Sequence, residues 1–74
     1  MNSITIKDEF IKLGQALKLA GAADSGVDAK FMIEDGKVKV NGETETRRGK
    51  KLHDGDVVDA DGTVFTVHAQ KAEQ

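Results

Sequence analysis

The fold of this chain is decided by residues 36–58, which read GKVKVNGETETRRGKKLHDGDVV. The stretch contains most of the turn signals, and six of the eleven basic residues lie between Lys37 and His53. Two valines alternate with two lysines before Asn41-Gly42, a dipeptide typical of tight hairpin turns. We expect the residues before this stretch to form a helical platform, and those after it to form a hairpin that completes a sheet.

The loop length of the first hairpin decides which side chains face the core. A two-residue loop would place Glu43 and Glu45 on the same face as Val38 and Val40, and would bury carboxylates. A three-residue loop with a glycine bulge would instead place Lys39 opposite Glu43. Because burying unpaired carboxylates costs more than forming a bulge, the sequence predicts the three-residue loop.

Downstream of the basic segment the sequence predicts a second hairpin. Asp54-Gly55 forms a turn, and strands are expected over 57–60 and 63–68, on either side of a tight turn at Asp61-Gly62. In this register Ala60 pairs with Thr63 and Val58 pairs with Phe65. Residues 69–74 have no apolar anchor and are expected to be frayed.

Upstream, a short strand over 3–7 precedes a helix from Asp8 to Ala20, in which apolar residues recur at steps of three and four. Acidic residues lie at its start, where the helix dipole favours them, and Gly21 follows it as a C-terminal cap. Gly14 inside this helix indicates close approach by another element.

A second helix is expected to begin at Ser25, whose hydroxyl is suited to capping the first free N–H groups. Its apolar stripe comprises Ala29, Met32 and Ile33 and is widened by Phe31 or Val27, and the helix ends near residue 36.

Length and composition indicate one soluble domain. A chain of 74 residues buries only about 60 to 65% of its unfolded surface, so a single small core is expected. Residues 37–53 contain six basic residues against two acids, whereas the rest contains five lysines against eleven acids. Without cysteine, a signal-like apolar run or a membrane-spanning run, the sequence predicts a cytoplasmic monomer with no membrane partner.

The sequence offers little for catalysis or metal binding. Asp54, Asp56, Asp59 and Asp61 lack the spacing of a calcium loop, and two isolated histidines without cysteine make no metal constellation. We therefore expect no enzyme, no metal and no other cofactor.

The order of these motifs resembles the S4 RNA-binding domain. Helix, turn and helix are followed by Gly-x-Val-x-Val-Asn-Gly, a polar loop and Leu-x-x-Gly-Asp-Val-Val, from about Lys12 to Val58. The wording is most similar to small stand-alone bacterial members of the YbcJ type, which have no catalytic partner attached. The resemblance implies an α+β class with an S4-like (alpha-L) fold, in which two helices in helix-turn-helix arrangement pack on a small, mainly antiparallel sheet. We expect residues 1–74 to form one S4-like domain, with a core at about 4–68.

The resemblance also implies an RNA-binding face made by the exposed start of the second helix and by the strand and loop beside it. Many S4 domains have Ser-Arg at the start of the second helix, but here Ser25 is followed by Gly26, which shifts the expected contact towards Lys30 and the loop. The candidate RNA-binding residues are Lys12, Lys30, Lys37, Lys39, Arg47, Arg48, Lys50 and Lys51.

Lysine and arginine bind RNA mainly through its phosphates. Because Phe10, Phe31 and Phe65 all fit core positions and the chain has no Trp or Tyr, we expect recognition of the backbone and shape of structured RNA, such as rRNA or tRNA, rather than base stacking. The alternative is a protein-interaction module whose basic loop docks an acidic protein. DNA binding fits poorly, because the second helix carries more acids than bases.

Overall fold

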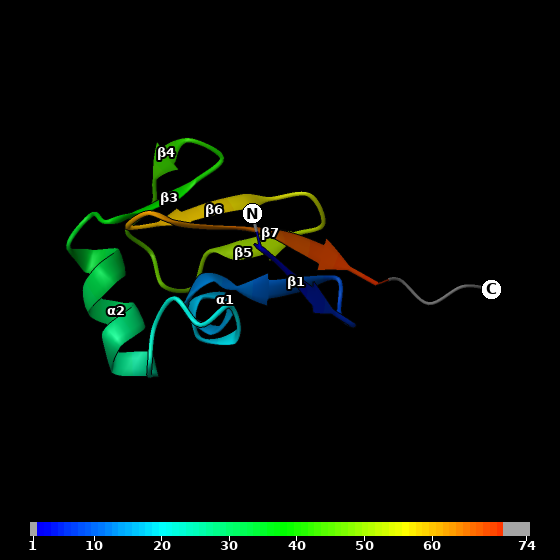
Figure 1. Cartoon of the computed structure of the whole chain (residues 1–74), viewed down its shortest axis with the longest axis horizontal. Coiled ribbons are helices and arrows are strands. Elements are labelled where there is room, and N and C mark those ends of the chain that lie inside the picture. Colours follow the sequence, from blue (N-terminus) through cyan, green and yellow to red (C-terminus); the bar gives the residue numbers. More distant parts are fainter. Residues whose placement is uncertain (1, 71–74) are drawn as a thin grey trace.

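The computed structural model describes residues 2–70 and shows two helices packed on strands (Figure 1). A five-stranded sheet has the order β1-β7-β6-β3-β4, and β2 and β5 form a separate two-stranded ribbon. Only the pair β1–β7 is parallel among the described strands, so the sheet is mainly antiparallel. The elements are β1 (Asn2–Ile6), β2 (Phe10–Lys12), α1 (Leu13–Leu19), α2 (Gly26–Glu34), β3 (Val38–Val40), β4 (Glu43–Thr44), β5 (Lys51–His53), β6 (Val57–Ala60) and β7 (Thr63–Ala69).

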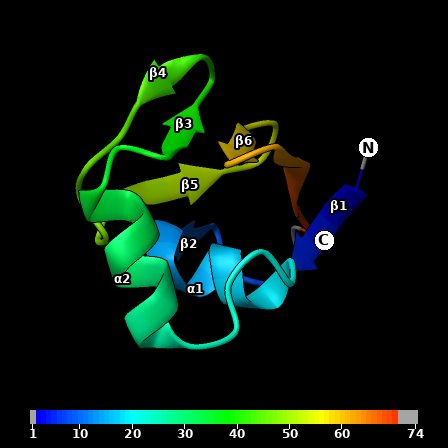
Figure 2. The ribbon, with the colours of Figure 1, turned by 60° about the vertical axis from the view of Figure 1, so that its left-hand side comes forward.

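The core lies between the sheet and the helices, which Figure 2 shows on one side of β3, β5 and β6. The strands of the sheet other than β4 contribute alternate side chains to it, and each helix contributes one stripe. Its largest fully buried members are Phe65, Leu13, Leu17, Ile33, Leu52, Val38, Val58 and Val67. The predicted α+β class, with two helices on a mainly antiparallel sheet, is confirmed.

The second hairpin forms as predicted. Asp61 and Gly62 have positive φ angles of 52° and 97°, Ala60 pairs with Thr63, and Val58 pairs with Phe65. The β7 strand continues to Ala69, and the N–H of Gln70 donates to the carbonyl of Ile6 at 2.7 Å. The expected fraying is therefore wrong for these two residues, and the remaining residues, 71–74, lie outside the described part of the chain.

The three-residue loop predicted for the first hairpin is wrong. Val40 pairs directly with Glu43, and Asn41 and Gly42 have φ angles of 52° and 88°, as a type I′ two-residue turn requires. The burial penalty that argued against this register is avoided, because Glu43 is exposed on the short β4 strand. Glu45 is largely covered, but its carboxylate is paired with Arg47.

The first helix is shorter than predicted, and residues 8–12 are not helical. Phe10–Lys12 forms β2, which pairs with β5, and α1 begins only at Leu13. The pairing buries Leu52 and partly buries Ile11. Because this burial depends on a strand distant in sequence, the spacing of apolar residues within the segment does not reveal it. The end of α1 matches the prediction, since Gly21 has a φ of +77°.

The second helix begins as predicted, with the N–H of Asp28 donating to the Ser25 hydroxyl at 3.2 Å. Ala29 and Ile33 are fully buried, but Val27 and Phe31 are 60% and 57% exposed and do not widen the buried stripe. Phe10 is also 37% exposed, so only Phe65 of the three phenylalanines occupies the core. Within residues 2–70, no helix is long and apolar enough to cross a membrane.

Candidate nucleic-acid interface

The loop between β4 and β5 is fixed by its backbone to the start of α1. The N–H of Leu13 donates to the carbonyl of Lys50 at 2.8 Å, and the N–H of Gly14 donates to the carbonyl of Arg48 at 3.1 Å. A Cβ atom at position 14 would lie 2.7 Å from the Cγ atom of Arg48, closer than packed carbons approach. The predicted close approach at Gly14 is thus confirmed, and the loop is held at two points along its length.

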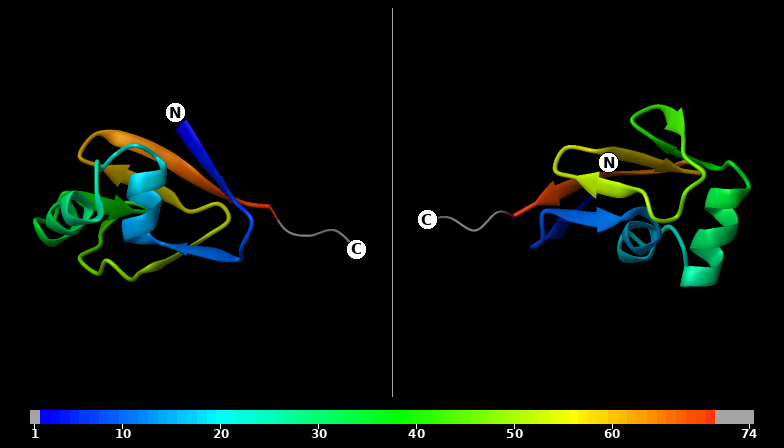
Figure 3. Two further views of the ribbon diagram at one scale, coloured as in Figure 1. Left: turned by 90° about the horizontal axis from the view of Figure 1, so that it is seen from below. Right: turned by 180° about the vertical axis from the view of Figure 1, so that it is seen from behind.

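The β2–β5 ribbon places basic side chains opposite each other. Figure 3 shows β2 beside β5. Lys12 pairs with Lys51, and the adjacent pair of Ile11 with Leu52 faces the core. Like charges at directly opposed positions of an antiparallel pair are destabilising. A bound polyanion would relieve this repulsion, which makes the outer face of the ribbon a candidate anion-binding surface.

Two adjacent surface hollows collect most of the cations. The first is lined by Arg47, Gly49, Lys50, Lys51 and His53. The second lies beside α1 and is lined by Lys12, Gly14, Gln15, Lys18, Gly26, Arg48 and Gly49. Gly49 lies between them and lines both. We define the basic surface as Lys12, Lys18, Arg47, Arg48, Lys50 and Lys51.

Lys18 was missed by the sequence reasoning, and the three remaining candidates line neither basic hollow, although Lys30 follows Gly26 by one turn of α2. Lys18 is exposed on α1, and the signal that could have found it was its position off the apolar stripe of the predicted helix, as for Lys12. Lys39 is directly opposite Asp59 on β6. Lys37 lines a hollow with acidic residues on and beside α2, and Lys30 is exposed on α2.

Arg47 has a partner within the loop. Its Nε atom and its backbone N–H both lie 3.0 Å from the same carboxylate oxygen of Glu45. The hydrogen bond from the Arg47 side chain lowers the pKa of the Glu45 carboxyl, and the same bond raises the pKa of Arg47. The Arg47 side chain remains 73% exposed, so it can still reach an anion.

The acidic run of the second hairpin has structural roles. Asp54 accepts the N–H of Ala69 at 2.9 Å, Asp56 accepts that of His53 at 2.7 Å, and Asp59 accepts that of Gly62 at 2.9 Å. Within residues 2–70, His and acidic side chains form no group of three or more that could hold a metal ion.

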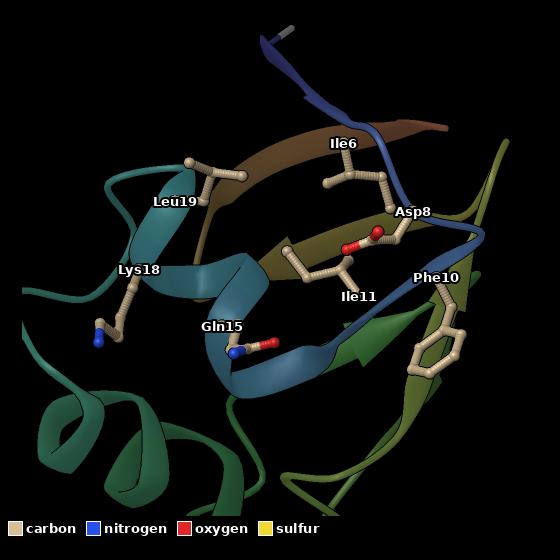
Figure 4. Close-up of a pocket in the computed structure, with 7 residues that line it drawn as sticks. All are labelled: Ile6, Asp8, Phe10, Ile11, Gln15, Lys18 and Leu19. Carbon is tan, nitrogen blue, oxygen red and sulfur yellow. The ribbon is translucent and has the colours of Figure 1, made fainter. Parts of the chain in front are cut away.

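A third hollow, between β1, β2 and α1, is more apolar (Figure 4). It shares Gln15 and Lys18 with the second basic hollow. Figure 4 shows the Asp8 carboxylate between Ile6 and Ile11, and the Phe10 ring directed to the other side of its strand. The Phe10 ring therefore lies towards the outer face of the ribbon, beside the basic surface.

Comparisons with known proteins agree with this geometry. A family model described as "S4 domain" matches residues 4–68. The "Probable ribosome maturation protein RlbA" of Bacillus subtilis strain 168 is 49% identical over 61 residues, covering 82% of this chain and 86% of that protein. YbcJ of Escherichia coli strain K12 is 42% identical over 52 residues, covering 70% of this chain and 74% of YbcJ.

The fold comparison points to the same family. The solution structure of YbcJ from E. coli, described as revealing an alpha-L motif involved in RNA binding, superposes with a TM-score of 0.73 and 37% identity. The match covers 93% of this chain and 89% of YbcJ. The sequence match, the helix pair on its sheet and this superposition lead to one conclusion: the chain belongs to the S4 domain family.

Proposed function

We propose that this protein binds RNA through the basic surface, without catalysing a reaction. The observation that carries the proposal is the fixed loop between β4 and β5, which gathers four cations beside Lys12 and Lys18 on an acidic chain. Membership of the S4 family and the RNA-binding description of YbcJ support the same ligand.

The binding mechanism is electrostatic and preformed. Lysine and arginine side chains neutralise phosphates and release counterions, so affinity falls as salt rises. Because the loop backbone is hydrogen-bonded to Leu13 and Gly14, the cations do not have to be gathered on binding. Arg48 can form two parallel hydrogen bonds to one phosphate, which a lysine cannot do.

The target we propose is structured RNA of the ribosome. The name of the B. subtilis relative associates that protein with ribosome maturation. The cations of the basic surface lie close together on the loop and beside α1, which suits the closely spaced phosphates of folded RNA. We propose that the protein acts as a monomer in the cytoplasm, where ribosomes are assembled, and that Lys30, Lys37 and Lys39 make at most peripheral contacts.

The proposal is tested by comparing two variants with the same change in charge. The first replaces Arg47, Arg48, Lys50 and Lys51 by alanine, and the second replaces Lys7, Lys30, Lys37 and Lys39. Binding of a ribosomal RNA hairpin is measured by fluorescence anisotropy at several salt concentrations. We expect the first variant to bind more than tenfold more weakly, with a salt slope smaller by about 3, because each phosphate contact adds about 0.7 to 0.9.

The second variant should retain most of the wild-type affinity and salt slope. Equal losses in both variants would show that net charge alone drives binding, and would refute the basic surface as the site. No binding of the hairpin by wild-type protein at about 0.15 M salt would favour the alternative of a basic loop that docks an acidic protein. If wild-type protein binds the hairpin, crosslinking in cells followed by sequencing of the recovered RNA would identify the natural RNA target.

A further inference from the structure

An exposed aromatic ring lies among the cations of the ribbon. Side chains alternate along a strand, so Phe10 and Lys12 share the outer face of β2. The register places His53 opposite Phe10 and Lys51 opposite Lys12, on the same outer face. The Phe10 side chain is 37% exposed, so part of its ring remains available for contact with another molecule.

The ring of Phe10 is positioned by neighbours that leave it accessible. The Nζ atom of Lys51 lies 4.8 Å from the ring centroid, in a cation–π contact. The ring of His53 is tilted by 50°, with its centroid 6.2 Å away. Figure 4 shows the Phe10 ring directed away from Ile6 and Asp8, although Phe10 also lines the hollow that contains these two residues.

We propose that Phe10 stacks on an unpaired nucleobase of the bound RNA, with His53 beside it and Lys51 moving from the ring to a neighbouring phosphate. This inference rests on the proposed RNA-binding function and names its substrate class: a duplex RNA that carries an unpaired nucleotide. The sequence predicted no base stacking, whereas this proposal includes one stacking contact, at Phe10.

The arrangement suits such a nucleotide in two respects. Lys51 and His53 also line the first basic hollow, so a base lying on Phe10 has its phosphates next to Arg47 and Lys50. Stacking on an aromatic ring is tolerant of base identity, because every base has a π-face. Phosphates supply the affinity and the unpaired base fixes the position of the RNA along the surface.

Phe31 provides a matched control. It is more exposed than Phe10, at 57%, but it lies on α2 in a hollow that contains Asp24, Asp28 and Asp35. Carboxylates repel the phosphates that accompany a base, so stacking is not expected there.

The test uses two RNA hairpins that differ at one position, one fully paired and one with a single bulged 2-aminopurine. Stacking quenches 2-aminopurine fluorescence, which reports the base directly. Anisotropy with a separate end label reports affinity for both hairpins. The proteins compared are the wild type, Phe10→Leu, Phe10→Trp and Phe31→Leu, each checked for folding by circular dichroism and thermal unfolding.

We expect the wild type, Phe10→Trp and Phe31→Leu to prefer the bulged hairpin and to quench its fluorescence. Phe10→Leu should lose about fivefold to a hundredfold in affinity for the bulged hairpin, and little for the paired one. Equal affinity and quenching in Phe10→Leu and wild type would overturn the stacking proposal while leaving RNA binding intact. Failure of wild-type protein to bind either hairpin would overturn both proposals.

Discussion

Asn41 and Asp56 are joined by a hydrogen bond between their side chains, with Nδ2 of Asn41 3.0 Å from Oδ1 of Asp56. Oδ1 of Asn41 accepts the N–H of Val57 at 2.9 Å, and the carbonyl of Val57 accepts the N–H of Asn41 at 2.7 Å. The segments Gly-x-Val-x-Val-Asn-Gly and Leu-x-x-Gly-Asp-Val-Val, which the basic loop separates, are therefore hydrogen-bonded to each other. Asn41 has a role beyond the turn that it forms, because it fixes the start of β6 against the end of β3.

Replacing Asn41 by glycine should destabilise the fold through loss of these side-chain bonds. Glycine accepts the positive φ of 52° at this turn, so the turn itself is preserved. The matched control is Asp61→Gly, at the equivalent position of the second hairpin with the same φ. In urea unfolding, Asn41→Gly should lose about 1 to 3 kcal/mol more than the control. Equal losses in the two variants would show that the Asn41 side chain contributes nothing beyond turn geometry.

Replacing Lys12 by glutamate should stabilise the protein and weaken RNA binding. The like-charged pair with Lys51 becomes an opposite-charge pair, which favours the ribbon by about 0.2 to 1 kcal/mol. Residue 12 also precedes α1, where the helix dipole favours an acid. The measurements are thermal unfolding and anisotropy with the paired hairpin. Lys12→Gln, which removes charge without forming a pair, should show a smaller change in both. A glutamate variant that binds RNA as the wild type does would exclude Lys12 from the interface.

The interactions that could be predicted from the sequence are those between residues close together in the chain. Asp61-Gly62 and its flanking residues gave the correct register, because turn chemistry and alternation lie within a few adjacent residues. The loop length predicted for the first hairpin was wrong, because Glu43 is exposed on β4 and Glu45 is paired with Arg47, so no unpaired carboxylate is buried. Arg47 is only two residues away from Glu45, but the pairing depends on a loop conformation that local patterns do not specify.

Long-range pairing explains the other differences. Residues 10–12 have spacing compatible with a helix, and only β5 on the far side of the loop makes them a strand. The same pairing leaves Phe10 exposed beside Lys51, whereas the sequence had predicted a core position for Phe10. The basic loop itself was predictable from composition. Its proximity to Lys18 was not, because the hydrogen bonds from Leu13 and Gly14 that bring it to α1 join distant residues.

Replacing Glu45 by glutamine should free Arg47 to bind RNA. It should also reduce the loss of folding stability as the pH falls. The pKa of Glu45 is lowered from its ordinary 4.5 by the bond from Arg47. A lowered folded-state pKa stabilises the protein above 4.5, and that contribution is lost as pH falls through the folded-state value. The wild type should therefore be the more stable of the two at neutral pH, and the difference should vanish in acid.

Urea unfolding of both proteins at neutral pH and at a pH below the lowered folded-state pKa of Glu45 measures this difference. Anisotropy at neutral pH should show tighter hairpin binding by Glu45→Gln, with a salt slope steeper by up to about 0.7 to 0.9 if Arg47 gains one phosphate. A stability difference that is the same at both pH values would contradict the role assigned to the Glu45–Arg47 pair.

Replacing Gly26 by arginine should strengthen RNA binding. Gly26 begins α2 and lines the hollow that contains Lys12, Lys18 and Arg48, at the position where many S4 domains have arginine. A Cβ atom at this position would have no neighbouring atom within 4 Å, so a side chain can begin there without a clash at its first carbon. An added guanidinium there would extend the basic surface towards α2. The affinity for the paired hairpin should rise severalfold, and the salt slope should steepen by about 0.7 to 0.9.

Gly26→Gln is the control, because it adds a side chain of similar reach and similar helix propensity without charge. The glutamine variant should unfold slightly above the wild type, since glycine is a weak helix former, and the arginine variant slightly below the glutamine variant, because the helix dipole disfavours a cation in the first turn. The increase in affinity should appear only with arginine. If arginine and glutamine variants bind the hairpin equally, RNA does not approach the hollow beside α1, and the interface would have to be confined to the loop and the outer face of the β2–β5 ribbon.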